Sequence, residues 1–550
     1  MIVHILFAFV RLWTGPSQED AEACIRLGQE KYQKADYDGA IAAFGRGIEL
    51  DPKNKRCYHG RGLAKSKKRD LRGAVEDYRK AIELDPNWAE AYVDEGLAYF
   101  GLKSYRDAIG DFSQALELDP KLAAAYCYRG RARTELRDYE KAIHDLTRAL
   151  EIDPKMIEAW LARAWARYLQ DDNDGAVADC TKAVELDGKN PDALLLRGKA
   201  RYYQGKYKDA IADMDRVLEL DLRCVDAWYH RGLARMAGDE YADAIADFTK
   251  AIELDSKHNR AYRWRAEAKY FANDYDGAIA DGERAKGLSE EDGHTYRIVG
   301  LAKLAKKDYP GAFEEFQLGV IIDPKNKYLW CDYGYFHLRL GEYSRAIGKY
   351  GKAIALDSRY VWAYSGRADA LRLAGDSKGA LADCARAIEL NPDFKRAYWV
   401  QGLTLYDSQD WNTASRVFLK IGALDAKDDY ARLRLFLIRA RSGERESAAA
   451  ELRKYLAGRQ SKEEGDWFGL LGSFALGERS EADLFKAAAT GDRKTPDEKK
   501  CEAYFYAATL RFVSGDREGA MGLFQKCLDT KVDHFDEYHS AKAEIAAQRK

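Results

Sequence analysis

The chain has 550 residues, of which 46% are hydrophobic and 33% are charged, and this balance favours a folded protein over a disordered one. Its 89 Lys and Arg nearly cancel its 91 Asp and Glu, so the formal net charge of −2 excludes a bulk attraction to nucleic acid or to an anionic membrane. The nine cysteines are scattered and form no Cys-x-x-Cys pair, so no zinc site or disulfide framework is predicted and small buried apolar side chains are expected.

Residues 1–20 form an apolar N-terminal segment. The apolar run from Ile2 to Trp13 is shorter than the roughly 20 residues that a transmembrane helix needs. A secretory signal would carry basic residues before the apolar run, whereas Met1 leads directly into Ile2. Two interpretations stay open, a truncated export signal and an apolar cap on the folded part. The protein could therefore work in the cytoplasm or in a bacterial periplasm or envelope, and association with a membrane stays undecided.

From Ala21 onward the sequence repeats every 34 residues. The tripeptide Leu50-Asp51-Pro52 recurs as Leu84-Asp85-Pro86, and variants continue at the same interval to Leu424. Twelve repeats without an insertion therefore occupy residues 21–428, a regularity that indicates one continuous helical array and a single elongated body. Positions within a repeat are numbered 1 to 34 from Ala21.

Each repeat is predicted to form two helices joined by a turn. Position 8 is Gly or Ala and position 20 is Ala in all twelve repeats, which predicts two helices in close contact. A larger side chain at position 20 should overpack this contact and cost about 1–3 kcal/mol. Position 4 is aromatic in ten repeats and shares one helical face with positions 8 and 11. Prolines recur at position 32, where a helix must end.

The combination of an aromatic residue at position 4, Gly at 8, Ala at 20, an aromatic residue at 24 and Pro at 32 resembles the tetratricopeptide repeat (TPR) family. The resemblance covers about three quarters of the chain. It implies an all-α fold, a right-handed α-solenoid of tandem TPR helix-turn-helix repeats. It also implies a concave groove, lined by the first helix of each repeat, that takes up proteins or extended peptides. A scaffold or adaptor for protein–protein interaction is therefore the expected function.

A charged pair links the two helices of many repeats. Wherever position 7 is Arg, position 23 is Asp, and this covariation between repeats predicts an Arg–carboxylate pair. The pairs are Arg61 with Asp77, Arg129 with Asp145, Arg163 with Asp179, Arg197 with Asp213, Arg231 with Asp247, Arg265 with Asp281, and Arg367 with Asp383. Position 11 is basic in eight repeats and lies one turn away, so it can share the same Asp. Any charge left over makes acidic peptides a hypothesis for the partner.

By the resemblance, positions 2, 5, 9, 12 and 13 line the groove. The partner-binding residues that follow are Phe100, Trp165, Tyr168, Tyr202, Tyr203, Tyr229, Arg263, Tyr270, Phe271, Arg297, Tyr328 and Tyr335. Aromatic side chains with a few cations suit an extended peptide. The repeat from Gly293 and the next one lack the Arg–Asp pair, so the stretch from Tyr328 to His337 is a candidate site or a bend. No repeat has Asn at position 6 or 9, so a clamp for chaperone C-termini is not expected.

Beyond residue 428 the pattern weakens. Residues 429–462 are predicted to form a thirteenth, weaker repeat, 463–500 a degenerate helical segment, and 501–550 a final TPR-like unit with a capping helix. The segments Trp467 to Ala489 and Cys501 to Ile545 resemble the C-terminal part of the NlpI family of bacterial envelope lipoproteins. This resemblance implies, as an alternative, an adaptor for envelope enzymes. The lipid-accepting Cys of a lipoprotein is fitted poorly by Cys24, which falls in the first predicted helix.

Motifs for catalysis are missing from the sequence. No Gly-rich phosphate loop, His-Glu-x-x-His or Gly-x-Ser-x-Gly motif is present, and the nine histidines lack metal-ligand spacing. We therefore predict no enzyme activity, no cofactor and no metal. Single-stranded RNA binding by a helical repeat is a weaker alternative because such proteins are usually basic, and an unrecognised active site is another.

Overall fold

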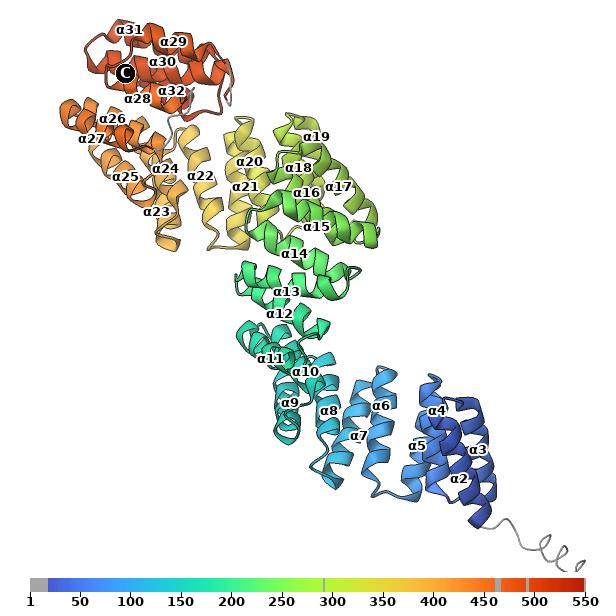
Figure 1. The fold of residues 1–550 in the computed structure, drawn as a ribbon. Helices are drawn as coiled ribbons and strands as arrows, with labels where there is room; N and C mark the ends of the chain where they lie inside the picture. Colours follow the sequence, from blue (N-terminus) through green and yellow to red (C-terminus); the bar gives the residue numbers. More distant parts are fainter. Residues whose placement is uncertain (1–17, 290–291, 460–465, 491–493, 549–550) are drawn as a thin grey trace, which may run out of the picture. The chain divides into compact units, whose positions relative to one another are not determined.

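The computed structural model describes residues 18–289, 292–459, 466–490 and 494–548 (Figure 1). These residues form α-helices joined by short turns and contain no strand, which confirms the predicted all-α solenoid. The apolar segment from Ile2 to Trp13 lies outside the described residues. Among the described helices, none has both the length and the apolar character that spanning a membrane would require.

The chain divides into two compact blocks, residues 1–268 and residues 269–550. The unbroken 34-residue period predicts a single body instead. The difference arises because each repeat of an array packs mainly on its neighbours, so no common core ties the whole array together. We refer to the two parts as the N-terminal block and the C-terminal block and describe each by itself.

In the N-terminal block, first and second helices of the repeats alternate. They are α2 (Gln18–Gln33), α3 (Tyr37–Leu50), α4 (Lys55–Lys67), α5 (Leu71–Leu84), α6 (Ala89–Gly101), α7 (Tyr105–Leu118), α8 (Ala123–Glu135), α9 (Tyr139–Ile152), α10 (Ile157–Leu169), α11 (Asn173–Leu186), α12 (Pro191–Tyr203), α13 (Tyr207–Leu220), α14 (Val225–Ala237) and α15 (Tyr241–Leu254). Helix α16 (Asn259–Phe271) begins in this block, and its last residues belong to the next.

In the C-terminal block the alternation continues from the second helix of repeat 8 through repeat 13 and then changes. The regular helices are α17 (Tyr275–Leu288), α18 (Gly293–Ala305), α19 (Tyr309–Ile322), α20 (Lys327–Arg339), α21 (Tyr343–Leu356), α22 (Val361–Leu373), α23 (Ser377–Leu390), α24 (Lys395–Asp407), α25 (Trp411–Leu424), α26 (Asp429–Arg441) and α27 (Arg445–Gly458). The final helices are α28 (Trp467–Ala475), α29 (Glu481–Ala488), α30 (Pro496–Val513), α31 (Arg517–Asp529) and α32 (Asp536–Gln548). Helix α30 begins before residue 501, so the predicted boundary falls inside it.

Two positions of each repeat define the turn between its helices. Position 15 has a left-handed backbone in all twelve repeats, with φ from 57° at Ala35 to 90° at Gly375, and such a residue ends the first helix. Position 16 is often Asp and caps the second helix. In the first repeat, the carboxylate of Asp36 accepts a hydrogen bond of 2.9 Å from the backbone N–H of Gly39. The sharp turn therefore follows from local side-chain chemistry.

The contact between positions 8 and 24 explains why position 8 is always small. A Cβ atom added to Gly232 would lie 2.7 Å from the ring of Phe248, well inside van der Waals contact. The nine repeats with Gly at position 8 carry Phe, Tyr, Leu or Met at position 24, whereas the three with Ala carry Cys or Gly. Ala164 and Cys180, for example, are packed together in one buried cluster. The two helices of a repeat therefore share a fixed volume, as close packing requires.

We expect Gly232→Ala to destabilise the N-terminal block. Overpacking against Phe248 costs about 1–3 kcal/mol, which outweighs a gain in helix propensity of up to about 1 kcal/mol. Gly110→Ala is the matched control because an added Cβ meets no atom within 4 Å there, and it should be stabilising. Urea denaturation followed by circular dichroism measures both variants. Equal stabilisation by the two substitutions would show that the contact between positions 8 and 24 does not limit the size of the side chain at position 8.

Seven of the nine cysteines are buried and the other two are partly buried, and all nine are free thiols. Cys180 and Cys384 lie at position 24, inside the contact just described. Burial raises the pKa of each of these two thiols to about 12. They therefore pack as small apolar side chains, as predicted.

Candidate functional site

The predicted Arg–Asp pairs are present inside the blocks. In six repeats the Nε and Nη2 atoms of the Arg donate to the two carboxylate oxygens of the Asp at 2.6–3.1 Å. The seventh pair is divided between the two blocks. Asp145 and Asp179 are almost fully buried, so each fork links the two helices of its repeat through a desolvated, bidentate contact. These arginines stabilise the array and are not available to a ligand.

The second row of cations, at position 11, is also paired with carboxylates. Six of its members bind the position-23 Asp of their own repeat at 2.6–2.8 Å. Lys303 binds Glu315 at 2.6 Å, and Lys31 binds Asp36 at 2.9 Å. All eight cations therefore have carboxylate partners. In five of these repeats, however, a single Asp serves both the Arg of position 7 and the cation of position 11, so the two positive charges exceed the one negative charge, and acidic peptides stay a hypothesis for the partner.

Repeat 3 is an exception in which two carboxylates face each other. Glu95 takes the place of the Arg, and Asp111 keeps the place of the Asp. Oδ2 of Asp111 is buried and accepts no hydrogen bond from the described residues. Burial, together with the nearby Glu95 and Asp107 charges, raises the pKa of Asp111 from 3.8 to about 8. Burial also raises the pKa of Glu95, against the opposing effect of Arg79.

We expect the stability of repeat 3 to fall as pH rises. The pKa of Asp111 is higher in the folded chain than in the unfolded chain, so its contribution is complete below about pH 4 and lost by about pH 8. Asp111→Asn mimics the protonated form. It should therefore stabilise the protein more at pH 9 than at pH 6 in urea denaturation. A gain that is the same at both pH values would contradict a protonated Asp111.

An apolar cavity opens on the first helices of repeats 4 to 6. It has a volume of about 370 Å³ and is formed by α8, α10 and α12. Its lining residues occupy positions 2, 5, 6 and 9 of their repeats, and they are Arg131, Glu158, Leu161, Ala162, Trp165, Asp192, Leu195, Leu196 and Lys199. These are largely the positions predicted to line the groove. Trp165 was predicted by name, whereas the others were missed because only the aromatic members of these positions were selected.

Four of the predicted aromatic residues gather beside this cavity. The rings of Trp165 and Tyr168 stack at 5.6 Å between centroids, and Tyr168 meets Tyr203 edge to face at 5.8 Å. Tyr202 meets Tyr203 edge to face at 5.2 Å. Trp165 is 41% exposed and Tyr203 is 62% exposed. Large aromatic side chains that remain this open to water mark a surface suited to binding a partner.

The rim of the cavity carries charges that the protein itself does not pair. Glu158 and Asp192 are exposed, lie at position 2 of adjacent repeats and form no ion pair among the described residues. Lys199, in contrast, binds Asp226 at 2.9 Å. Arg131 stacks on the rings of Phe100 and Tyr128 at 5.3 and 5.1 Å. The rim near position 2 is therefore acidic.

The remaining predicted residues of the N-terminal block lie outside this cluster. Phe100 is half-buried and meets Tyr105 and Tyr128 edge to face. Tyr229 is only 7% exposed and packs on Phe248 and His258, so it presents little side-chain area to a partner, and its role in binding stays a prediction. Arg263 is half-buried, with its guanidinium 5.4 Å from the centre of a Trp264 ring.

The predicted residues of the C-terminal block are spread over three helices. Tyr270 is half-buried, and burial raises its pKa to about 12, whereas the neighbouring Phe271 is 47% exposed. Arg297 binds Asp332 at 2.8 Å. Tyr328 is 50% exposed and meets Tyr360 edge to face at 5.4 Å. Tyr270 also packs, together with Tyr335, against one buried cluster of α18 to α20, and the charges of Tyr335 and Arg297 both affect its pKa.

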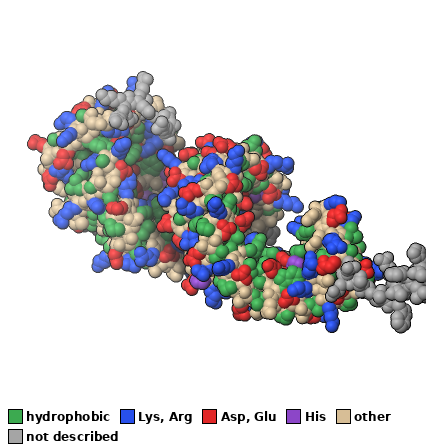
Figure 2. Space-filling view, turned by 60° about the horizontal axis from the view of Figure 1, so that its bottom comes forward, with side chains coloured by type: hydrophobic (Ala, Val, Ile, Leu, Met, Phe, Trp, Pro, Cys, Tyr) green, Lys and Arg blue, Asp and Glu red, His purple; other side chains and the backbone are tan. Residues whose placement is uncertain are grey.

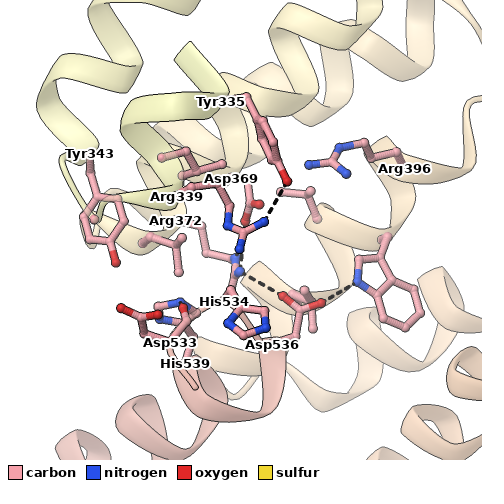
Figure 3. Close-up of a pocket in the computed structure, with 16 residues that line it drawn as sticks. Tyr335, Arg339, Tyr343, Asp369, Arg372, Arg396, Asp533, His534, Asp536 and His539 are labelled. Atoms are coloured by element: carbon pink, nitrogen blue, oxygen red, sulfur yellow. Dashed lines mark hydrogen bonds and ion pairs between the residues drawn. The ribbon is translucent and has the colours of Figure 1, made fainter. Parts of the chain in front are cut away.

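Tyr335 lines a second cavity, of about 250 Å³, in the C-terminal block. Its hydroxyl accepts a hydrogen bond of 2.9 Å from Arg339 (Figure 3). The same cavity is lined by Arg372, Arg396 and, from the end of the chain, Asp533 and Asp536. A segment remote in sequence therefore closes this part of the first-helix surface.

Helix α32 fills the first-helix surface of the last repeats, which the sequence did not predict. Asp536 accepts hydrogen bonds from Trp399 Nε1 at 2.9 Å and from Arg372 Nη2 at 3.3 Å (Figure 3). Glu537 accepts one of 2.9 Å from Arg434, a fully buried residue of α26. The groove of repeats 11 to 13 is thus occupied by the chain's own C-terminus and is not open to a partner.

Charged side chains of both signs are interspersed over the face that Figure 2 shows, without an extended patch of one sign. In the described part of the chain, no group of three or more His, Cys, Asp or Glu residues is arranged to hold a metal ion. The cavity of repeats 4 to 6 offers apolar contact, aromatic surface and the charges of its rim.

Comparison with known proteins places the repeats in a described family. Sequence models of the tetratricopeptide repeat match residues 21–54, 55–87, 89–122, 123–156, 195–256, 231–293 and 334–398. Together these matches cover more than half of the chain.

Several solved structures are similar in fold. The crystal structure of yeast Tom70 is 18% identical, with 79% of this chain and 96% of that chain covered and a TM-score of 0.41. The Cut9–Hcn1 structure of the APC/C is 15% identical, with 76% and 90% covered and a TM-score of 0.40. The MamA protein is 28% identical, with 32% and 94% covered and a TM-score of 0.30.

Proposed function

We propose that this chain, which belongs to the tetratricopeptide-repeat family of protein-interaction scaffolds, binds a segment of a partner protein on the first helices of repeats 4 to 6. The observation that carries the proposal is the cluster of exposed Trp165 and Tyr203 around the half-buried Tyr168, beside an apolar cavity. Residues that combine a large apolar area with few rotatable bonds dominate binding energy at protein interfaces. Because the cavity adjoins them, a partner side chain can be enclosed there.

The fold positions this surface without distorting it. Trp165 and Lys199 occupy position 9, and Leu161 and Leu195 occupy position 5, on helices whose opposite faces are fixed by the Arg–Asp forks. A surface built on helices held in this way changes little when a partner arrives. Members of this family are typically non-catalytic, and the described residues supply no metal-binding cluster. We therefore assign the cavity to binding and not to chemistry.

A role as an adaptor for envelope enzymes is a narrower hypothesis about where the protein works. It depends on the resemblance of the segments Trp467 to Ala489 and Cys501 to Ile545 to the NlpI family and on an export signal, and residues 1–17 lie outside the described residues. Fractionation of host cells tests it: recovery in the envelope supports this role, and recovery with cytosolic proteins opposes it. Single-stranded RNA is a weaker candidate because the cations of positions 7 and 11 have carboxylate partners.

We expect Trp165→Ala/Tyr203→Ala to weaken partner binding by about 30-fold or more. Each side chain is an exposed aromatic anchor, and truncation of such an anchor costs about 2 kcal/mol or more when it is central to an interface. A photo-reactive amino acid at Leu169 captures the partner in host cells, mass spectrometry identifies the captured segment, and calorimetry with that segment gives the affinities.

Leu222→Ala/Ile321→Ala is the control for this measurement. Both residues are 68% exposed and lie outside the groove positions. Their truncation therefore removes an exposed apolar area similar to that removed by Trp165→Ala/Tyr203→Ala. The control should bind as the native chain does, and both double variants should keep the native circular dichroism. An unchanged affinity in Trp165→Ala/Tyr203→Ala would refute the proposed surface.

A further inference from the structure

The C-terminal block shows how the first-helix surface of this chain holds a helix. Helix α32 lies against α24 and contacts Trp399 at position 5, Arg372 at position 12 and Arg441 at position 13. Its contacting residues, from Asp536 through Ser540 to Glu544, follow a spacing of four. A single helical face therefore fits these positions, as in helix-in-groove recognition.

The same positions in repeats 5 and 6 carry different chemistry. Leu161 and Leu195 stand at position 5, and Tyr168 and Tyr202 stand at position 12. Where α32 meets arginines with carboxylates, a helix on repeats 5 and 6 would meet aliphatic and aromatic side chains. The small Ala162 at position 6 borders the cavity of about 370 Å³, a volume that accommodates a large apolar side chain. The helix seated here must therefore present an apolar stripe.

Position 2 carries opposite charges at the cavities of the two blocks. In repeat 12 position 2 is Arg396, which lines the cavity that the carboxylates of Asp533 and Asp536 also line (Figure 3). In repeats 5 and 6 position 2 is acidic, and the carboxylates of Glu158 and Asp192 have no cation partner among the described residues. The segment that binds beside Arg396 is therefore acidic, as α32 is, and a segment that binds beside Glu158 and Asp192 is expected to be basic.

We infer that the segment bound by the N-terminal block is an amphipathic helix with a large apolar side chain for the cavity and Lys or Arg directed at Glu158 and Asp192. The inference rests on the proposed function and specifies its partner. Arg131 is the cavity cation without a carboxylate partner in the described part of the chain, and its guanidinium lies over the rings of Phe100 and Tyr128. The two acidic residues outnumber it, so a basic helix is favoured over an acidic one.

Two synthetic helices test this inference on the full-length protein. One is an amphipathic peptide of Leu and Lys with Leu at i, i+3, i+4 and i+7, and the other has Glu in place of every Lys. Fluorescence anisotropy gives the affinity of each peptide. We expect the Leu/Lys peptide to bind about tenfold or more tightly than the Leu/Glu peptide, and the difference to shrink as salt screens the rim charges.

Glu158→Lys/Asp192→Lys should reverse the preference between the peptides. Glu140→Lys/Asp209→Lys is the matched control, because it makes the same change in net charge at exposed residues of the second helices α9 and α13. The control should keep the native preference. A preference for the Leu/Glu peptide, or one that changes equally in both variants, would overturn the inference.

Trp165→Ala separates the inference from the function on which it rests. If Trp165→Ala weakens binding of either peptide but Glu158→Lys/Asp192→Lys has no effect, the basic character of the helix is refuted. The proposed binding surface is then still supported. Binding that is unaffected by Trp165→Ala, or no binding of either peptide, counts against both the inference and the proposed surface.

Discussion

Replacement of Arg434 by Met is expected to lower the stability of the C-terminal block by about 3–5 kcal/mol, the usual result of leaving a buried charge without its partner. The guanidinium is fully buried. It donates to Glu537 at 2.9 Å and to Ser540 at 3.3 Å, and it lies 4.5 Å from the centre of the Phe505 ring. One side chain of α26 therefore holds α30 and α32 in place.

Urea denaturation and limited proteolysis measure this effect. Arg434→Met should unfold at a lower urea concentration and should be cut earlier within residues 530–548. Arg434→Met/Glu537→Gln is the control, because it removes both charges together and should recover most of the loss. If Arg434→Met were as stable and as resistant as the native chain, α32 would not be anchored by this pair.

Replacement of Asp179 by Ala is expected to cost a similar 3–5 kcal/mol or so in the N-terminal block. Asp179 accepts two hydrogen bonds from Arg163, at 2.9 and 2.8 Å, and one of 2.8 Å from Arg167. Its removal leaves two cations partly buried without a carboxylate. Because repeats stabilise their neighbours, loosening of repeat 5 should spread to repeats 4 and 6.

Hydrogen exchange resolves where the Asp179→Ala protein loosens. We expect faster exchange of backbone amides in α10 and α11 first, and little change in the C-terminal block. Arg163→Leu/Asp179→Asn serves as the comparison, since it removes a charge from each side and should be less destabilised than Asp179→Ala. A uniform increase in amide exchange throughout the chain would argue that the Arg163–Asp179 pair does not act mainly within its own repeat.

Local, repeating features could be predicted from the sequence because every repeat samples the same contact. Small residues at positions 8 and 20 indicate where the two helices touch, and the covariation of Arg at position 7 with Asp at position 23 predicts the forks. The period also places Trp165 and Tyr203 on the surface beside the cavity. These predictions need no knowledge of how distant parts of the chain are arranged.

Contacts that occur once could not be predicted in this way. Arg434 and Glu537 are hydrogen-bonded although they lie 103 residues apart in the sequence, and no repeated pattern predicts that pair. The closure of repeats 11 to 13 by α32 was missed for this reason. The burial of Tyr229 could not be predicted either, because position 5 alone does not reveal that its ring packs on Phe248 and His258. The rim residues Glu158 and Asp192 were missed because only aromatic residues and a few cations were chosen from the groove positions.

Hydrogen exchange with the Leu/Lys peptide bound is the most direct test of the claim that the N-terminal block binds a partner on its first helices. Protection confined to α8, α10 and α12, and lost in Trp165→Ala/Tyr203→Ala, is the predicted result. Protection of the second helices α9, α11 and α13, or of the C-terminal block alone, would contradict the claim.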